Sequence, residues 1–283
     1  MIARLLVLFI CFSNLYSYSQ SGKYERSKEI GLIVGTSYYL GELNPYRHFG
    51  TDLKLSGGIS FRNNFNKRWT AKASVLYGHV EAYDNNSSDP WNKNRNLHFR
   101  NQFIESSLQI ELNYFQYQIG SDNWISPYLF LGLSYTNMRP QANYNGIWYE
   151  TQPLGTEGQG TSEGGAKYAT NVFAIPLGVG VKVNIWKIFG FSMEWGVRRT
   201  FTDYFDDISG TYIDPEFLLD ENGLASSTLA DQSLQPVLPD GTNTGVQRGD
   251  PGRKDLYFFA LASLNIRIDK KATSCWNGSI KMP

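Results

Sequence analysis

Apolar and polar residues alternate along most of this chain. Between residues 29 and 268 the alternation runs in stretches of about ten to fourteen residues, which is the length of a tilted membrane-spanning strand. Because successive side chains of a strand point to opposite faces, each stretch has one apolar face and one polar face. In the segment 52–63, for example, Leu53, Leu55 and Ile59 alternate with polar residues. A closed barrel is the sheet structure that satisfies every backbone group in a bilayer.

The alternation predicts eight strands, at 30–43, 52–63, 68–83, 99–115, 126–138, 171–185, 191–202 and 256–268. The links between them alternate in length as well. The short links are 63–67, 116–124 and 186–190, and the long links are 42–51, 84–98, 139–170 and 203–255. Outer-membrane barrels combine short periplasmic turns with long outer loops. We therefore predict an all-β fold: an eight-stranded antiparallel up-and-down transmembrane β-barrel with long extracellular loops, short periplasmic turns and both termini in the periplasm.

The polar faces of the predicted strands carry charges of both signs. A barrel of eight strands is just wide enough to be filled by side chains, and buried charges must be paired. We therefore expect a plugged, salt-bridged interior and not a pore. By strand parity the inward charges are Lys54, Arg62, Lys72, Lys182, Arg198, Arg267, Glu105, Glu111 and Glu194.

The two ends of the chain fall outside this pattern. Arg4 and the apolar run 5–12 predict a signal peptide over residues 1–19, which leaves the barrel at 20–268 and a periplasmic tail at 269–283. No stretch has about 18 consecutive apolar residues, so the sequence predicts no transmembrane helix. Cleavage leaves Cys275 as the single cysteine, and thus no internal disulfide. The tail is either disordered or a docking segment anchored by Trp276.

Two loop segments carry candidate chemistry. The Gly- and Thr-rich segment 154–161 has no lysine in a phosphate-binding pattern, and we interpret it as a flexible outer loop. After the seventh strand, Asp203, Asp206 and Asp207 could bind Ca²⁺, although their spacing is not that of an EF-hand. The alternative, which we favour, is that Arg198 and Arg199 pair with these aspartates and attach the base of the loop to the barrel rim.

Nothing in the sequence predicts catalysis. The three histidines, His48, His79 and His98, fall on outer loops or strand ends, and no Gly-x-Ser-x-Gly or His-Glu-x-x-His pattern accompanies them. We expect a non-enzymatic protein without a cofactor, a resident metal or a small-molecule substrate. The 26 basic and 26 acidic residues balance, so nucleic acid is not an expected partner; the expected surroundings are the lipid bilayer of the outer membrane.

Four separated segments resemble a known family. They are 38–45, 95–100, 156–160 and 198–209. Together they are similar to the PorG-like outer-membrane barrels associated with the type IX secretion system, and the similarity runs over about residues 30–268. Glu42 stands where that family often has aspartate. The resemblance implies an accessory component of protein secretion and gliding motility that associates with a periplasmic ring of PorK and PorN. It carries over no catalytic residue.

This reading assigns the partner contacts to the periplasmic turns and tail. The candidates are Trp186, Lys187, Cys275 and Trp276. A surface-exposed binding or adhesion barrel, acting through its outer loops and above all through 203–255, is the alternative hypothesis. A passive pore is a third.

Overall fold

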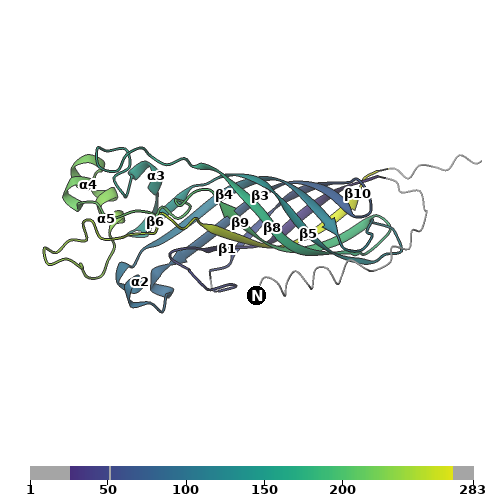
Figure 1. Cartoon of the computed structure of the whole chain (residues 1–283), viewed down its shortest axis with the longest axis horizontal. Coiled ribbons are helices and arrows are strands. Elements are labelled where there is room, and N and C mark those ends of the chain that lie inside the picture. The colour runs from purple at the N-terminus through teal and green to yellow at the C-terminus, as the bar shows by residue number, and fades with distance from the viewer. Residues whose placement is uncertain (1–25, 51, 270–283) are drawn as a thin grey trace, which may run out of the picture.

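The computed structural model describes residues 26–50 and 52–269. Long antiparallel strands form a closed barrel, in which each strand pairs with its chain neighbours and the first pairs with the last (Figure 1). The eight barrel strands are β1 (Ser27–Leu40), β2 (Lys54–Asn64), β3 (Trp69–Tyr83), β4 (His98–Asn113), β5 (Ile125–Asn137), β8 (Asn171–Asn184), β9 (Phe189–Thr200) and β10 (Leu256–Arg267).

The predicted fold class is confirmed, and the predicted strands coincide with the observed ones apart from their ends. The largest difference is at β1, which ends at Leu40 because the chain then turns. The Gly41 amide donates to the Asn44 carbonyl (3.2 Å) and the Asn44 side chain donates to the Tyr39 carbonyl (2.8 Å). Of the helices in the described part of the chain, none combines the length and apolar character needed to cross a bilayer.

The outer face of the barrel is apolar. Leu32, Leu55 and Leu108 expose 68%, 73% and 70% of their surface. Outward residues of adjacent strands lie side by side in register, as Leu32 does with Ile59 and Ile59 with Val75, so the exposed side chains form a continuous band. Soluble monomers rarely expose apolar patches larger than a few hundred Å². The band and the closed sheet are the architecture of an integral outer-membrane barrel.

Ion pairs fill the interior, as the strand parity predicts. Glu111 lies 3.1 Å from Arg62 and 2.6 Å from Lys182, and Glu194 lies 2.6 Å from Lys72. All five side chains are buried. Opposite charges come from different strands, so each ion pair also joins two strands across the barrel. Together with buried aromatic rings, these ion pairs fill the interior around Glu111 and Glu194.

The two ends of the barrel differ. The three short links, 65–68, 114–124 and 185–188, lie at one end together with the beginning of β1 and the end of β10; we call this the turn end. The opposite end carries the four long links, 41–53, 84–97, 138–170 and 201–255, which we call the loop cap (Figure 1). The predicted alternation of long and short links is thus confirmed.

The loop cap contains secondary structure that the sequence pattern did not predict. A hairpin of β6 (Pro140–Tyr144) and β7 (Ile147–Glu150) extends the sheet by pairing with the loop-cap end of β4. The elements of the cap are a 3-10 turn η2 (Asp84–Asn86), α2 (Pro90–Arg95), β6 (Pro140–Tyr144), β7 (Ile147–Glu150), α3 (Thr151–Leu154), α4 (Pro215–Asn222) and α5 (Leu224–Ala230). The predicted signal peptide, Cys275 and Trp276 lie outside the described residues.

The lipid-facing band makes Leu108→Arg a test of membrane insertion. Leu108 is in the middle of the outward apolar row of β4, so we expect the arginine to destabilise the barrel by about 2–4 kcal/mol in lipid vesicles. Reversible urea unfolding measures this loss. Tyr46→Arg, at an exposed position in a long link, is the control and should leave the unfolding free energy unchanged. An unchanged value for Leu108→Arg would contradict the lipid-facing assignment.

Glu111→Ala tests the ion-paired interior. Removal of this carboxylate leaves Arg62 and Lys182 buried without their partner, and we expect a loss of about 3–5 kcal/mol in the free energy of unfolding. The same urea titration applies, with the exposed Glu163→Ala as control. A loss no larger than that of the control would mean that the interior charges do not depend on pairing.

Candidate functional site

The loop cap closes the mouth of the barrel. The longest link, 201–255, inserts Phe205 between barrel residues, where its ring stacks on Tyr257 with centroids 4.8 Å apart and lies 5.3 Å from Phe103. The Asn101 side chain donates to the Phe205 carbonyl (2.7 Å). Phe205 and Ile208 are buried. The link is therefore anchored in the barrel core and does not lie free above it.

Arg95 connects α2 to the rest of the cap. Its guanidinium binds Asp84 through two hydrogen bonds of 2.7 and 2.8 Å and donates to the Arg248 carbonyl (2.6 Å). Such bidentate pairs have a defined geometry. Burial raises the pKa of Asp84, while the hydrogen bonds from Arg95 oppose that shift.

A second buried arginine, Arg248, holds three parts of the cap together. It donates to the Glu157 carboxylate (2.8 Å), the Asp207 carbonyl (2.6 Å) and the Ala230 carbonyl (3.0 Å). Glu157 also accepts the Ser209 amide (2.9 Å). Burial raises the pKa of Asp207 to about 6, against the opposing charge of Arg248.

These contacts correct the interpretation of 154–161 as a flexible loop. Thr156, Glu157 and Gln159 are buried, and Thr156 donates to Asp207 (2.5 Å). The polar side chains of this segment make hydrogen bonds inside the cap and are not exposed to solvent. Its partners lie in the link 201–255, so the pattern of residues within the segment could not predict them.

The predicted pairing of Arg198 and Arg199 with the aspartates of the link is wrong. Arg198 points into the barrel, 3.4 Å from Glu105, and Arg199 is exposed on the outer face. Strand parity separates the two arginines, and Arg248 serves as the base that pairs with Asp207. No nearby residue signals this role, because Arg248 follows Asp207 by 41 positions.

Three carboxylates meet beside the barrel rim. The Tyr39 hydroxyl lies 3.2 Å from Glu42, 2.5 Å from Asp206 and 2.8 Å from Asp255. One oxygen from each carboxylate lies within 4.8 Å of the others, so these residues could hold a metal ion. Burial, followed by repulsion between the charges, raises the pKa values of Asp206 and Asp255 well above their usual range. Of the three, the sequence pattern indicated only Asp206 as a candidate cation ligand, because Glu42 and Asp255 are distant from it in the chain.

The three histidines have separate local partners. His48 accepts or donates a hydrogen bond with the Tyr38 hydroxyl (3.1 Å), and His79 lies 3.0 Å from Glu81. His98 accepts the Asn143 amide (2.9 Å) and stacks on Tyr83.

The predicted partner-contact residues of the turn end are exposed. Trp186 and Lys187 lie in the link between β8 and β9, and the Trp186 side chain is 71% exposed. Trp124, in another short link, is also exposed. Exposed aromatic side chains at the turn end are typical either of the membrane interface or of contacts with a protein partner.

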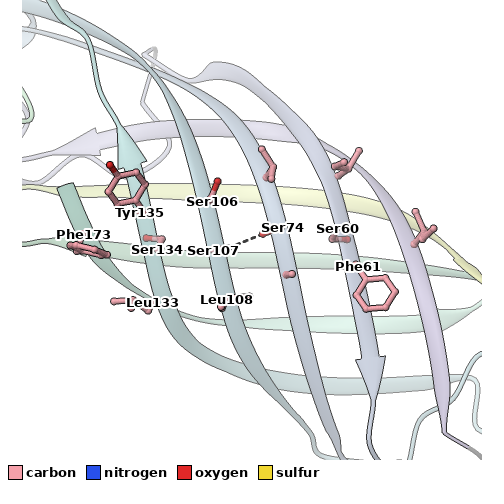
Figure 2. A pocket seen from close by; sticks show the side chains of 14 residues that line it. Ser60, Phe61, Ser74, Ser106, Ser107, Leu108, Leu133, Ser134, Tyr135 and Phe173 are labelled. Carbon is pink, nitrogen blue, oxygen red and sulfur yellow. Dashed lines mark hydrogen bonds between the residues drawn. The ribbon is translucent and has the colours of Figure 1, made fainter. Parts of the chain in front are cut away.

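A hollow of about 620 Å³ indents the outer face and is lined by residues of β1, β2, β3, β4, β5 and β8 (Figure 2). Small residues, Ala73 and Ser106, lie between larger ones such as Leu108 and Phe173. Figure 2 shows the serine row behind it, in which the Ser74 and Ser107 hydroxyls are 2.8 Å apart. The apolar lining of the hollow fits hydrocarbon, which identifies it as part of the lipid-facing surface.

This chain matches one protein family and is similar to several solved barrel structures. The family model described as "Domain of unknown function (DUF6089)" matches residues 3–216. No curated protein matches the chain.

Solved structures similar to this chain are barrels of low sequence identity. OprG from Pseudomonas aeruginosa has a TM-score of 0.41 at 10% identity, with 89% of this chain and 99% of that chain covered. The N-terminal β-barrel domain of Pseudomonas aeruginosa OprF has a TM-score of 0.38 at 10% identity, covering 87% and 100%. Neisserial surface protein A has a TM-score of 0.40 at 9% identity, covering 86% and 99%.

Arg248→Ala tests whether this residue holds the cap together. The substitution leaves Glu157 and Asp207 buried without their base, so we expect the cap, but not the barrel, to open. Limited proteolysis of folded protein in detergent should cleave the link 201–255 at least tenfold faster than in the wild type. Arg253→Ala, an exposed arginine of the same link, should not change the rate. Equal rates for both variants would contradict this role of Arg248.

Proposed function

The chain belongs to the DUF6089 family, and from this premise we propose that it is a non-enzymatic accessory component of the type IX protein secretion and gliding machinery. In this proposal the barrel lies in the outer membrane with its termini and turn end in the periplasm. There it anchors or positions a periplasmic ring of the PorK and PorN type. The four segments that resemble the PorG-like family support the choice of machinery.

The observation that carries the proposal is the filled barrel. Ion pairs such as Lys72–Glu194 and Arg62–Glu111 occupy the interior, and Phe205 covers the mouth. A barrel of this kind is suited to act through its two ends and its outer face, and not as a conduit. An architectural role fits these properties better than a passive pore does.

The turn end supplies the contact surface in this proposal. Trp186 is an exposed aromatic residue next to the exposed Lys187, both beyond the last paired residues of β8. Aromatic anchors dominate the binding energy of many interfaces. The tail residues Cys275 and Trp276 would add to this surface.

A surface-exposed binding barrel is the second candidate. The observation in its favour is that the loop cap is a folded unit, tied together by Arg95 and Arg248. Rigid loops on a barrel scaffold are a common way to present a binding surface. Removal of residues 214–247 separates the two functions: secretion persists under the first proposal, whereas binding of an external ligand fails under the second.

The double variant Trp186→Ala, Lys187→Glu tests the ring contact. We expect the tagged variant, purified from detergent-solubilised membranes, to recover less than about a tenth of the ring proteins that the wild type recovers, because a central anchor residue contributes at least about 2 kcal/mol. Barrel levels in the membrane should be unchanged. Leu234→Ser, at an exposed site in the loop cap, is the matched control. Normal ring capture by the double variant, together with normal secretion in a deletion strain, would refute the proposal.

A further inference from the structure

We propose that Glu42, Asp206 and Asp255 form a binding site for Ca²⁺ that ties the loop cap to the barrel rim. The site goes beyond the secretion role, since it depends only on the cap. Glu42 lies two residues after the end of β1, Asp255 directly precedes β10, and Asp206 belongs to the long link 201–255. A cation bound here would join three segments that are distant in the sequence.

The geometry of the oxygens suits calcium. One oxygen of each carboxylate lies within 4.8 Å of the other two. Oxygens that share one Ca²⁺ at the usual 2.3–2.6 Å are up to about 5 Å apart, and calcium accepts irregular arrangements of six to eight ligands. Magnesium requires a tighter octahedron with oxygens at about 2.1 Å.

No basic side chain of the described residues pairs directly with this cluster, although the charge of Arg95 acts on Glu42 and Asp206 from a longer distance. The Tyr39 hydroxyl lies beside all three carboxylates but has a single proton, which it can donate to one of them at a time. Among the described residues, no ion pair joins Glu42, Asp206 or Asp255 to a basic side chain. Buried acids of the barrel are different, because Glu111 and Glu194 each have a base within 4 Å.

Asp203 is an independent observation that favours a cation at this position. Its side chain is only 4% exposed. Neither of its carboxylate oxygens makes a hydrogen bond of normal geometry, although the Ser209 side chain lies near them. The charge of Asp203 is near enough to Glu42 and Asp255 to repel them, so it adds to the negative charge of the same cluster. The Oε1 atom of Glu42 is likewise buried and makes no hydrogen bond of normal geometry, although the backbone N–H of Asp250 lies near this carboxylate. A bound cation would satisfy these oxygens directly or through a coordinated water.

The site has a path to solvent. Glu42 is half-buried and lines an open cavity of about 310 Å³ together with Asp250 and Arg248. A hydrated ion can therefore reach Glu42, at the edge of the cluster, without unfolding of the cap. Calcium sites of extracellular modules have dissociation constants of about 10⁻⁴ to 10⁻³ M, and we expect a value in that range.

Titration of the complete barrel tests the proposal. Chelator-treated protein in detergent micelles is titrated with CaCl₂ and, separately, with MgCl₂ in a calorimeter. We expect one Ca²⁺ per chain, at least tenfold weaker binding of Mg²⁺, and at least a tenfold loss of calcium affinity in Asp206→Asn. Asp240→Asn, an exposed aspartate of the same link, is the matched control and should bind calcium as the wild type does.

Two further measurements distinguish the loss of a calcium ligand from a disturbed cap. Because Asp206→Asn could disturb the cap, Tyr39→Phe serves as a second variant: it removes the shared hydroxyl but keeps the carboxylates, and it should still bind calcium. Calcium should also slow proteolysis of link 201–255 in the wild type. Absence of calcium binding, equal affinity in Asp206→Asn, or a cap that is insensitive to calcium and to chelator would overturn the proposal and indicate that protons neutralise the cluster.

Discussion

Closure of the barrel is the constraint on which the rest of this structure depends. In a bilayer no water is present to satisfy backbone groups, so β1 must pair with β10 and leave no free edge. Closure of so few strands brings the inward side chains into contact across a narrow interior. Those side chains include the positive charge of Arg62 and the negative charge of Glu111. Their pairing offsets the free-energy cost of burying two charges. The apolar exterior and the ion-paired interior are therefore two results of one closed sheet.

Strand parity explains why the sequence predicts the barrel well. An alternation of period two reports the face of each residue, and this is enough to place Leu108 outside and Glu194 inside. It also explains the error at Arg198, whose parity points inward while its neighbours in sequence suggested a role at the rim. The strand ends could be predicted to within a few residues, because turns such as 41–44 depend on side chains close in sequence.

The cap follows no such period. Arg248 contacts Glu157 across 91 positions and Tyr39 contacts Asp206 across 167. Contacts of this kind are determined by how links meet above the barrel, and local pattern does not encode them. Four segments that are separate in the sequence, 38–45, 95–100, 156–160 and 198–209, do meet there, because Tyr39, Arg95, Glu157 and Asp206 all belong to the cap network or its rim.

The position of Tyr39 has a consequence for assembly. Its hydroxyl bonds to Asp255 across 216 residues, at the seam where the first and last strands meet. The seam requires almost the whole chain to have been ordered, and contacts of such separation form late. The cap network can therefore reach its final form only on a barrel that has already closed. A folded cap therefore indicates that the barrel has closed. This indication lies at the opposite end of the barrel from the short turns.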